Sequence, residues 1–135
     1  MPRYMLDTNM CIYLIKHQPQ SVAERFAQCL VGDVVMSAIT YAELEYGVNA
    51  AVNPALEREN LAALIEDIKV EAFDERAGTV YGSIRLATRE SKKDQLDKLI
   101  AAHAVALGVT LVTNNMRDFA RYPGVVIENW LESTH

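Results

Sequence analysis

The sequence lacks any apolar run near the ~18 residues that a membrane-spanning helix needs. Its first residues also lack the basic-then-apolar pattern of a secretory signal, because Asp7 interrupts them. Only two cysteines are present, Cys11 and Cys29, and their spacing fits neither a metal site nor a redox pair, so we expect them to pack as small apolar side chains. No repeat, linker or low-complexity tract interrupts the chain. These absences predict a cytoplasmic protein that does not engage a membrane.

An excess of positive charge is absent as well. The chain has 13 basic and 18 acidic residues and a formal net charge of −5, which argues against a broad basic face that grips nucleic acid. The basic residues are unevenly distributed, however, and residues 85–98 contain five of them: Arg85, Arg89, Lys92, Lys93 and Lys98. These side chains either form solvated helix faces or contact an anionic partner.

The 135 residues, of which half are apolar, suffice for one hydrophobic core, so residues 1–135 are expected to form a single domain. Apolar periodicity predicts strands at residues 3–6, 34–37, 70–73, 110–113 and 125–127, and helices at 8–15, from 19, from 37 or 40, from 54, from 74 and over 99–107. Asp74 is a candidate N-cap and Gly108 a candidate C-cap. Strands that alternate with helices indicate an α/β fold, with a parallel sheet between two helical layers.

The stretch MLDTN places Asp7 where the first strand ends. In parallel α/β sheets, functional side chains gather at the carboxyl ends of the strands. Asp7 could instead be the N-cap of the following helix, but Thr8 and Asn9 could serve as caps too. The alternative role for Thr8 and Asn9 is polar support that orients Asp7 or a water molecule.

Glu43, in SAITYAELEYG, shares the apolar stripe of its helix with Ile39 and Tyr46. A glutamate that faces a core is costly without a cation or hydrogen-bond partners, so Glu43 is the candidate functional acid. Glu45 points about 160° away by helical geometry and is the natural solvent-facing acid, although periodicity alone does not exclude the reverse assignment.

Further acids lie later in the chain. Asp97 borders the apolar side of the helix LDKLIAAHAVALG, where compensation of the helix dipole is the alternative explanation. Thr113 and Asn115 stand at the end of another strand, and Asp118, one turn later, could also pair with Arg121. We expect His103, which lies among alanines, to be a hydrogen-bonded core histidine.

Carboxylates from separate segments that meet at one sheet edge need a counter-charge or must become protonated. With oxygen donors alone, the expected cation is hard, Mg²⁺ or Mn²⁺, and such an ion suits phosphoryl chemistry.

Four motifs occur in order: MLDTN, S-x-x-T-x-x-E-L-x-x-G at 37–47, D-x-x-I-A-A-H-A at 97–104 and LVTNNxRDF at 111–119. In this order and spacing, over essentially the whole chain, they resemble the PIN-domain ribonucleases, and closely the VapC toxins of bacterial toxin–antitoxin pairs. The resemblance implies a three-layer α/β/α fold with a mostly parallel sheet of four to five strands. It also implies cleavage of RNA, such as a structured tRNA, by Mg²⁺- or Mn²⁺-activated water.

By the same resemblance, Asp7, Glu43 and Asp97 are catalytic residues that hold the metal, and Asp118 is a fourth catalytic acid. Thr8, Asn9, Thr113 and Asn115 would give polar support, and the five basic residues of 85–98 would contact RNA. A VapB-type antitoxin and a homodimer are the implied partners. The chain departs from the family pattern at Asn115, where many members have Asp. It departs again at SKKDQLD, where relatives have a Gly-containing approach and where Asp94 rivals Asp97.

Two other protein classes fit the sequence less well. A non-catalytic PIN-like module that binds RNA or protein should have lost acids from the cluster, whereas this chain keeps at least three. A phospho-accepting receiver domain needs an acidic pair at the first strand and a lysine at the end of the last, which MLDTN and VVIENW do not provide.

Overall fold

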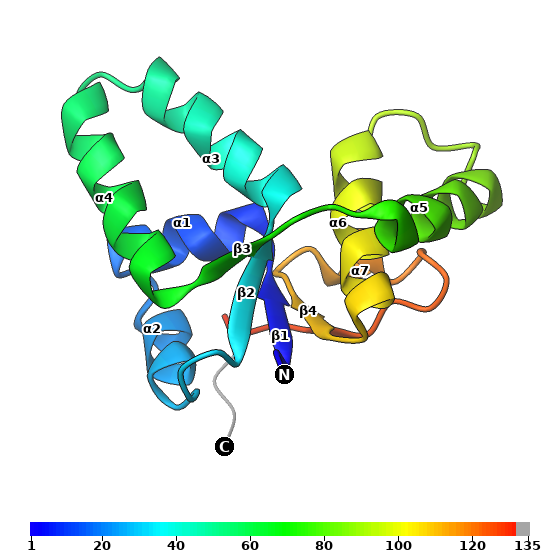
Figure 1. Cartoon of the computed structure of the whole chain (residues 1–135), viewed down its shortest axis with the longest axis horizontal. Coiled ribbons are helices and arrows are strands. Elements are labelled where there is room, and N and C mark those ends of the chain that lie inside the picture. Colours follow the sequence, from blue (N-terminus) through cyan, green and yellow to red (C-terminus); the bar gives the residue numbers. More distant parts are fainter. Residues whose placement is uncertain (132–135) are drawn as a thin grey trace.

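A five-stranded, fully parallel sheet forms the centre of the computed structural model, which describes residues 1–131 (Figure 1). The strands are β1 (Tyr4–Leu6), β2 (Val34–Ser37), β3 (Lys69–Glu71), β4 (Thr110–Val112) and β5 (Ile127–Glu128), in the spatial order β3-β2-β1-β4-β5. In register, Met5 of β1 lies between Val35 of β2 and Leu111 of β4. The predicted parallel α/β sheet is confirmed.

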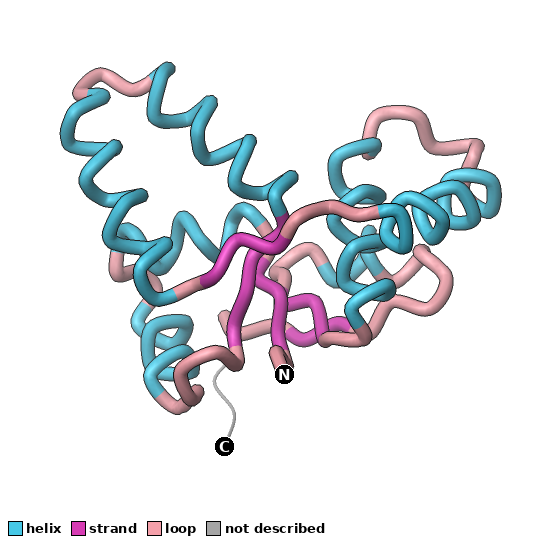
Figure 2. Tube along the Cα trace, in the orientation of Figure 1, coloured by secondary structure: helices cyan, strands magenta, loops and turns pink. Residues whose placement is uncertain are grey.

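Seven helices in the described residues connect and cover the strands. They are α1 (Thr8–Lys16), α2 (Gln20–Ala27), α3 (Ala38–Ala50), α4 (Pro54–Asp67), α5 (Glu75–Ala87), α6 (Gln95–Leu107) and α7 (Met116–Phe119). Helices α1 to α4 lie on one side of the sheet, and α5, α6 and α7 lie on the other (Figures 1 and 2). The predicted three-layer architecture is therefore present.

Successive side chains along each strand point to opposite faces of the sheet and pack into two separate hydrophobic cores. Leu6 of β1 and Val112 of β4 pack with α1 to α4, whereas Met5 and Leu111, one residue earlier in each strand, pack with α5, α6 and α7. This is the period-two geometry of a strand buried on both faces. Cys11 is fully buried in the first core, as expected for a small apolar side chain.

Capping residues fix three helix ends; Asp74 and Gly108 were predicted as caps, and Ser37 was one of two residues at which α3 was expected to begin. Asp74 accepts a hydrogen bond from the Ala77 amide at the start of α5, and Ser37 accepts one from the Ile39 amide at the start of α3. Gly108 ends α6 in the left-handed conformation, with φ of 71°.

Other predicted boundaries were wrong. Helix α6 begins at Gln95 rather than near residue 99, and the short helix α7 was not predicted because four residues carry no helical period. None of the helices in the described part of the chain is long and apolar enough to cross a bilayer.

Strand order places a switch point beside β1. The chain runs from β1 outward through β2 to β3, then returns to the other side of β1 with β4. Helices that follow β1 and β4 therefore leave the sheet toward opposite faces, and the carboxyl ends of these two strands open a crevice between them. Asp7 follows β1 and Thr113 follows β4.

Candidate active site

A pocket of about 170 Å³ lies at this switch point, and four separate segments line it. Its lining residues are Asp7, Thr8, Asn9, Glu43, Asp97, Ile100, Asn115 and Phe119. Three predicted acids thus share one pocket, although they are 36 and 54 residues apart in sequence (43 − 7 and 97 − 43). Of the described residues that line the pocket, none is basic.

The Asp7 side chain both caps a helix and lines the pocket, so the capping alternative does not remove it from the candidate site. One carboxylate oxygen accepts a 2.9 Å hydrogen bond from the Met10 amide and caps α1, and the side chain also lines the pocket. Burial raises the pKa of Asp7, hydrogen bonds from Thr113 and the Met10 amide act against this rise, and the nearby Glu43 adds to it. The capping bond fixes the carboxylate in place and leaves it in an unfavourable environment for a negative charge.

Glu43 faces the pocket from α3, and the Thr8 hydroxyl donates a 2.8 Å hydrogen bond to it. The predicted polar support by Thr8 thus acts on Glu43. Glu45 instead lies outside the pocket, and its carboxylate is 2.7 Å from the Arg58 guanidinium of α4. Hydrogen bonds from Arg58 and from Tyr41 hold the pKa of Glu45 at about 2. The structure therefore separates the two glutamates as the sequence suggested.

Asp97, in the first turn of α6, is a second pocket acid with a raised pKa. Burial and then the negative charges of Asp7, Glu43, Asp94 and Asp118 raise its pKa to about 6. A bound cation would offset the repulsion among such half-buried acids.

No fourth acid lines the pocket among the described residues; Asn115 lies on its wall beside the three acids. Asn115 precedes α7 and lines the pocket. Its backbone amide donates a 2.9 Å hydrogen bond to the buried hydroxyl of Thr113. Asp118 is exposed and does not line the pocket, although its charge raises the pKa of Asp97. The pairing of Asp118 with Arg121 considered above is not formed, because Arg121 pairs with Asp94 at 3.3 Å.

The donor set fits a hard divalent cation. All polar groups on the pocket wall offer oxygen, from carboxylates, one hydroxyl and amide carbonyls, and Mg²⁺ or Mn²⁺ prefers such ligands. In residues 1–131, however, no three side chains of His, Cys, Asp and Glu already lie close enough to bind one ion together. That Asp7, Glu43 and Asp97 coordinate one ion stays a prediction.

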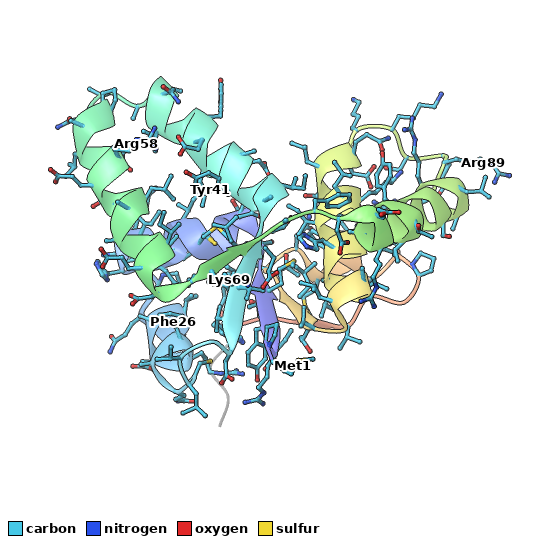
Figure 3. All side chains as sticks on the ribbon, viewed as in Figure 1. Met1, Phe26, Tyr41, Arg58, Lys69 and Arg89 are labelled. Atoms are coloured by element: carbon cyan, nitrogen blue, oxygen red, sulfur yellow. The ribbon has the colours of Figure 1, made fainter. Side chains whose placement is uncertain are left out.

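The basic residues predicted to bind RNA fall into two groups. Four of them are exposed, namely Arg85, Arg89, Lys92 and Lys93, and Arg89 lies in the turn just after α5 (Figure 3). Lys93 borders a second hollow of about 280 Å³ that shares Glu43 and Asp97 with the pocket.

The prediction for Lys98 is wrong. Its side chain is 0% exposed, and its ammonium donates hydrogen bonds to the carbonyls of Thr88 and Ser91. A lysine enclosed in this way cannot contact a phosphate. Sequence reasoning also missed what Asp94 does, although the i,i+4 spacing of Asp94 and Lys98 was a readable signal for an ion pair.

His103 is a core residue, as expected. Its Nδ1 lies 2.7 Å from the Ser37 hydroxyl at the end of β2, and its ring packs edge-on against Phe73. Burial lowers the pKa of His103, which keeps the imidazole neutral. This contact ties α6, which carries Asp97, to the sheet.

Comparison with known proteins agrees with this geometry. The family model of the PIN domain matches residues 4–125. The chain is 37% identical over 132 residues to the tRNA(fMet)-specific endonuclease VapC of Salmonella typhimurium, covering 96% of this chain and 99% of that protein. It is 34% identical to ribonuclease VapC2 of Rickettsia felis, covering 94% and 97%.

Solved structures give the same result. The DNA-bound VapBC complex of Salmonella typhimurium superposes with a TM-score of 0.88 at 37% identity, covering 96% of this chain and 99% of that one. FitAcB of Neisseria gonorrhoeae gives 0.85 at 27% identity, with 96% and 99% covered. The chain belongs to the PIN-domain family. Within that family it is a ribonuclease of the VapC type.

Proposed function

We propose that this chain is the toxin of a VapBC-type toxin–antitoxin module and a Mg²⁺- or Mn²⁺-dependent endoribonuclease. The observation that carries the metal dependence is the pocket itself, in which Asp7, Glu43 and Asp97 converge from three elements on a wall without a basic residue among those described. Burial, and then repulsion from the neighbouring acids, raises the pKa of Asp97 to about 6, and both effects favour binding of a divalent cation.

The proposed roles follow from the position of each side chain. Asp7, at the start of α1, and Asp97, in the first turn of α6, would hold the cation, since both line the pocket and both have raised pKa values. Glu43, oriented by Thr8, would bind the cation directly or accept a proton from the attacking water. Asn115 and Asn9 would orient water or a phosphate oxygen with their amides. A bound divalent cation supplies activation of water and stabilisation of charge on the phosphate.

The proposed substrate is RNA, and a structured RNA such as a tRNA is the specific candidate, because a VapC relative at 37% identity is named for tRNA(fMet). Lys93, beside the acidic pocket, and the exposed Arg85, Arg89 and Lys92 would neutralise backbone phosphates. The protein's overall negative charge is compatible with this assignment, since only the rim of the pocket has to be basic.

The proposed partners are a VapB-type antitoxin and a second copy of the chain. Solved relatives of this fold are VapBC complexes, among them that of Salmonella typhimurium. We further propose that residues 1–135 form one PIN domain that acts in the cytoplasm, where its RNA substrates are.

The test is cleavage of a tRNA mixture by purified protein without antitoxin. Cleavage should need Mg²⁺ or Mn²⁺, stop with EDTA, and be lost in Asp7→Ala protein that still unfolds cooperatively. Glu45→Gln is the matched control, because this acid lies on the same helix as Glu43 but outside the pocket, and it should cleave like wild type. Metal-independent cleavage by Asp7→Ala protein would refute the proposal. RNA binding without any cleavage would favour a non-catalytic module.

A further inference from the structure

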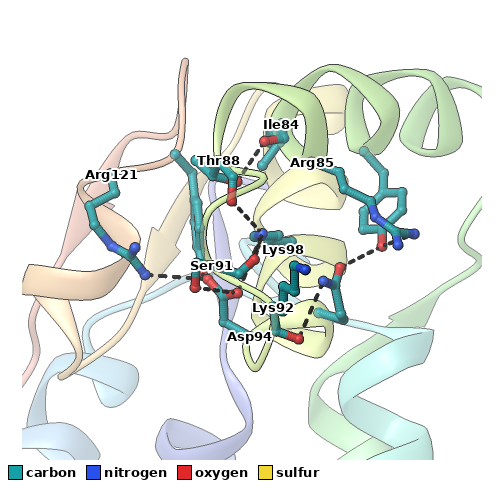
Figure 4. Close-up of polar contacts among 11 residues, drawn as sticks. Ile84, Arg85, Thr88, Ser91, Lys92, Asp94, Lys98 and Arg121 are labelled. Carbon is teal, nitrogen blue, oxygen red and sulfur yellow. Dashed lines mark hydrogen bonds and ion pairs between the residues drawn. The ribbon is translucent and has the colours of Figure 1, made fainter.

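A buried ion-pair network lies directly beside the pocket, in the segment where the chain departs from the family pattern. The Lys98 ammonium, fully enclosed, donates to the Thr88 carbonyl at 2.9 Å and to the Ser91 carbonyl at 2.6 Å, and it lies 3.4 Å from the Asp94 carboxylate (Figure 4). All three ammonium protons therefore have a partner. The loop between α5 and α6 wraps around this one side chain.

Asp94 extends the network to a distant segment. Its carboxylate accepts hydrogen bonds from the Ser91 hydroxyl at 2.8 Å and from the Tyr122 hydroxyl at 2.5 Å, and Arg121 lies 3.3 Å away (Figure 4). Burial raises the pKa of Asp94, but the hydrogen bonds from Tyr122 and Ser91 outweigh burial and hold the pKa at about 2. The carboxylate is therefore ionised at any physiological pH.

This network connects two walls of the pocket. Lys98 directly follows Asp97 in the first turn of α6, so the ammonium and the pocket acid are on adjacent residues. Arg121 and Tyr122 follow α7, the helix whose flanking Asn115 and terminal Phe119 line the pocket opposite α6. The Tyr122 ring packs edge-on against Phe119.

Helix capping does not explain the network. The Asp94 side chain makes no capping hydrogen bond to α6 and is directed at α7's flanking residues instead. Stability is also a weak explanation, because the cost of desolvating a buried ion pair offsets most of its attraction. What a fully hydrogen-bonded pair does fix is the relative position of the segments that it joins.

We propose that Asp94, Lys98 and Tyr122 are positioning residues that hold α6 and α7 at the separation at which Asp97 can bind the divalent cation while Asn115 orients water or a phosphate oxygen beside it. The inference rests on the proposed function. Asp94 borders the hollow that Lys93 and Asp97 also line, but its side-chain hydrogen bonds run to Ser91, Tyr122 and Lys98 rather than to Lys93 or to the pocket acids. The network therefore acts on cation binding and turnover rather than on capture of RNA. Lys98 was predicted from the sequence to contact RNA, but its ammonium binds the Asp94 carboxylate and two backbone carbonyls inside the protein.

The experiment measures Mn²⁺ binding directly, by electron paramagnetic resonance of the free ion in the absence of RNA, together with kcat and KM for RNA cleavage. The variants are Asp94→Asn and Tyr122→Phe, both close in shape to the native residue. Asp33→Asn is the control, because Asp33 has a similarly buried side chain, 12% exposed against 13% for Asp94, and is also near an arginine. Asp33 directly precedes β2 and so lies at the amino ends of the strands, whereas the pocket lies at their carboxyl ends.

Asp94→Asn should weaken Mn²⁺ binding by about tenfold and Tyr122→Phe by about threefold, in line with residues that orient metal ligands. For both, kcat should fall while KM for RNA changes less than about twofold, since the RNA-facing groups are intact. Asp33→Asn should lower the melting temperature without changing Mn²⁺ binding.

The inference is overturned if Asp94→Asn and Tyr122→Phe lower the melting temperature like Asp33→Asn but keep wild-type Mn²⁺ binding and kcat. A rise in KM alone would also overturn it, because that result assigns the network to RNA capture. Wild-type protein that binds no Mn²⁺ and needs no metal for cleavage would instead refute the proposed function, and the inference with it.

Discussion

Two carboxylates at the start of α6, three residues apart, behave in opposite ways. Asp94 has its pKa held at about 2, whereas the pKa of Asp97 rises to about 6. Both are partly buried, so burial alone does not distinguish them. Asp94 has Tyr122, Ser91 and Lys98 as hydrogen-bond partners, whereas Asp97 has mainly other acids around it.

The comparison separates structural from functional charge. A satisfied carboxylate stabilises the folded state, while an unsatisfied carboxylate in a pocket opposes folding and persists because it serves another purpose. In this chain, the unsatisfied acids point toward a divalent cation, and the satisfied acid joins the elements that carry them. The following predictions test that division, from the largest expected effect to the smallest.

Asp97→Asn should reduce RNA cleavage by roughly a thousandfold or more, because it removes a charged group from the proposed metal site. The measurement is single-turnover cleavage with saturating Mg²⁺, alongside circular dichroism to verify the fold. Cleavage within about tenfold of wild type would remove Asp97 from the catalytic set.

Lys98→Met should destabilise the protein by about 3 kcal/mol, because it leaves the Asp94 carboxylate and two carbonyls without their buried partner. Urea unfolding at pH 7 measures this. The double variant Asp94→Asn, Lys98→Met should lose less stability than the sum of the two single variants. Additive losses would show that the two side chains do not act as a pair.

Asp97→Asn should also stabilise the metal-free protein by about 1–2 kcal/mol above pH 6. The folded-state pKa of about 6 lies above the usual 3.8, so ionisation opposes folding, and wild type loses stability as the pH rises through this window. Unfolding at a series of pH values in EDTA should therefore show wild type and Asp97→Asn alike near pH 4 and divergent at pH 7. Parallel curves would mean that Asp97 is not perturbed.

The contribution of Asp94 to stability depends on pH in the opposite direction. Its folded-state pKa of about 2 lies below 3.8, so its contribution is present above about pH 4 and is lost as the pH falls toward 2. The stability difference between wild type and Asp94→Asn should therefore shrink at acidic pH. A difference that grows on acidification would contradict the account.

Asn115→Ala should lower kcat by about tenfold and Asp118→Ala by no more than about threefold, since Asn115 lines the pocket while Asp118 acts only through its field. Kinetics of the two variants under identical conditions decide the fourth position. The reverse order would restore Asp118 as the fourth acid, as the family resemblance first suggested.

Most of the fold was readable from the sequence because it depends on local patterns. Strands of two to four residues were found from short apolar runs, and Ser37, Asp74 and Gly108 act as helix caps through their own backbone neighbours. The pocket location followed from Asp7 at a strand end and Glu43 on an apolar stripe. These features require only the period of a helix or strand.

The rest depends on contacts between distant segments. Asp118, three residues away, was a candidate partner for Arg121, but Arg121 pairs with Asp94, 27 residues away. Lys98 was interpreted as a surface lysine, because periodicity does not show that the preceding loop folds over its ammonium. The assignment of Asp94 and Asp97 to different roles likewise depends on Tyr122, which comes close only in the folded chain.

The central claim is that the acids of the pocket make a cation-dependent nuclease site. Its most direct test is sequencing of the 5′-ends of RNA fragments that wild type and Asp97→Asn produce with Mg²⁺ and without antitoxin. The account predicts discrete new ends with wild type that are absent with Asp97→Asn and in EDTA. The same ends at the same yield in all three samples would contradict it.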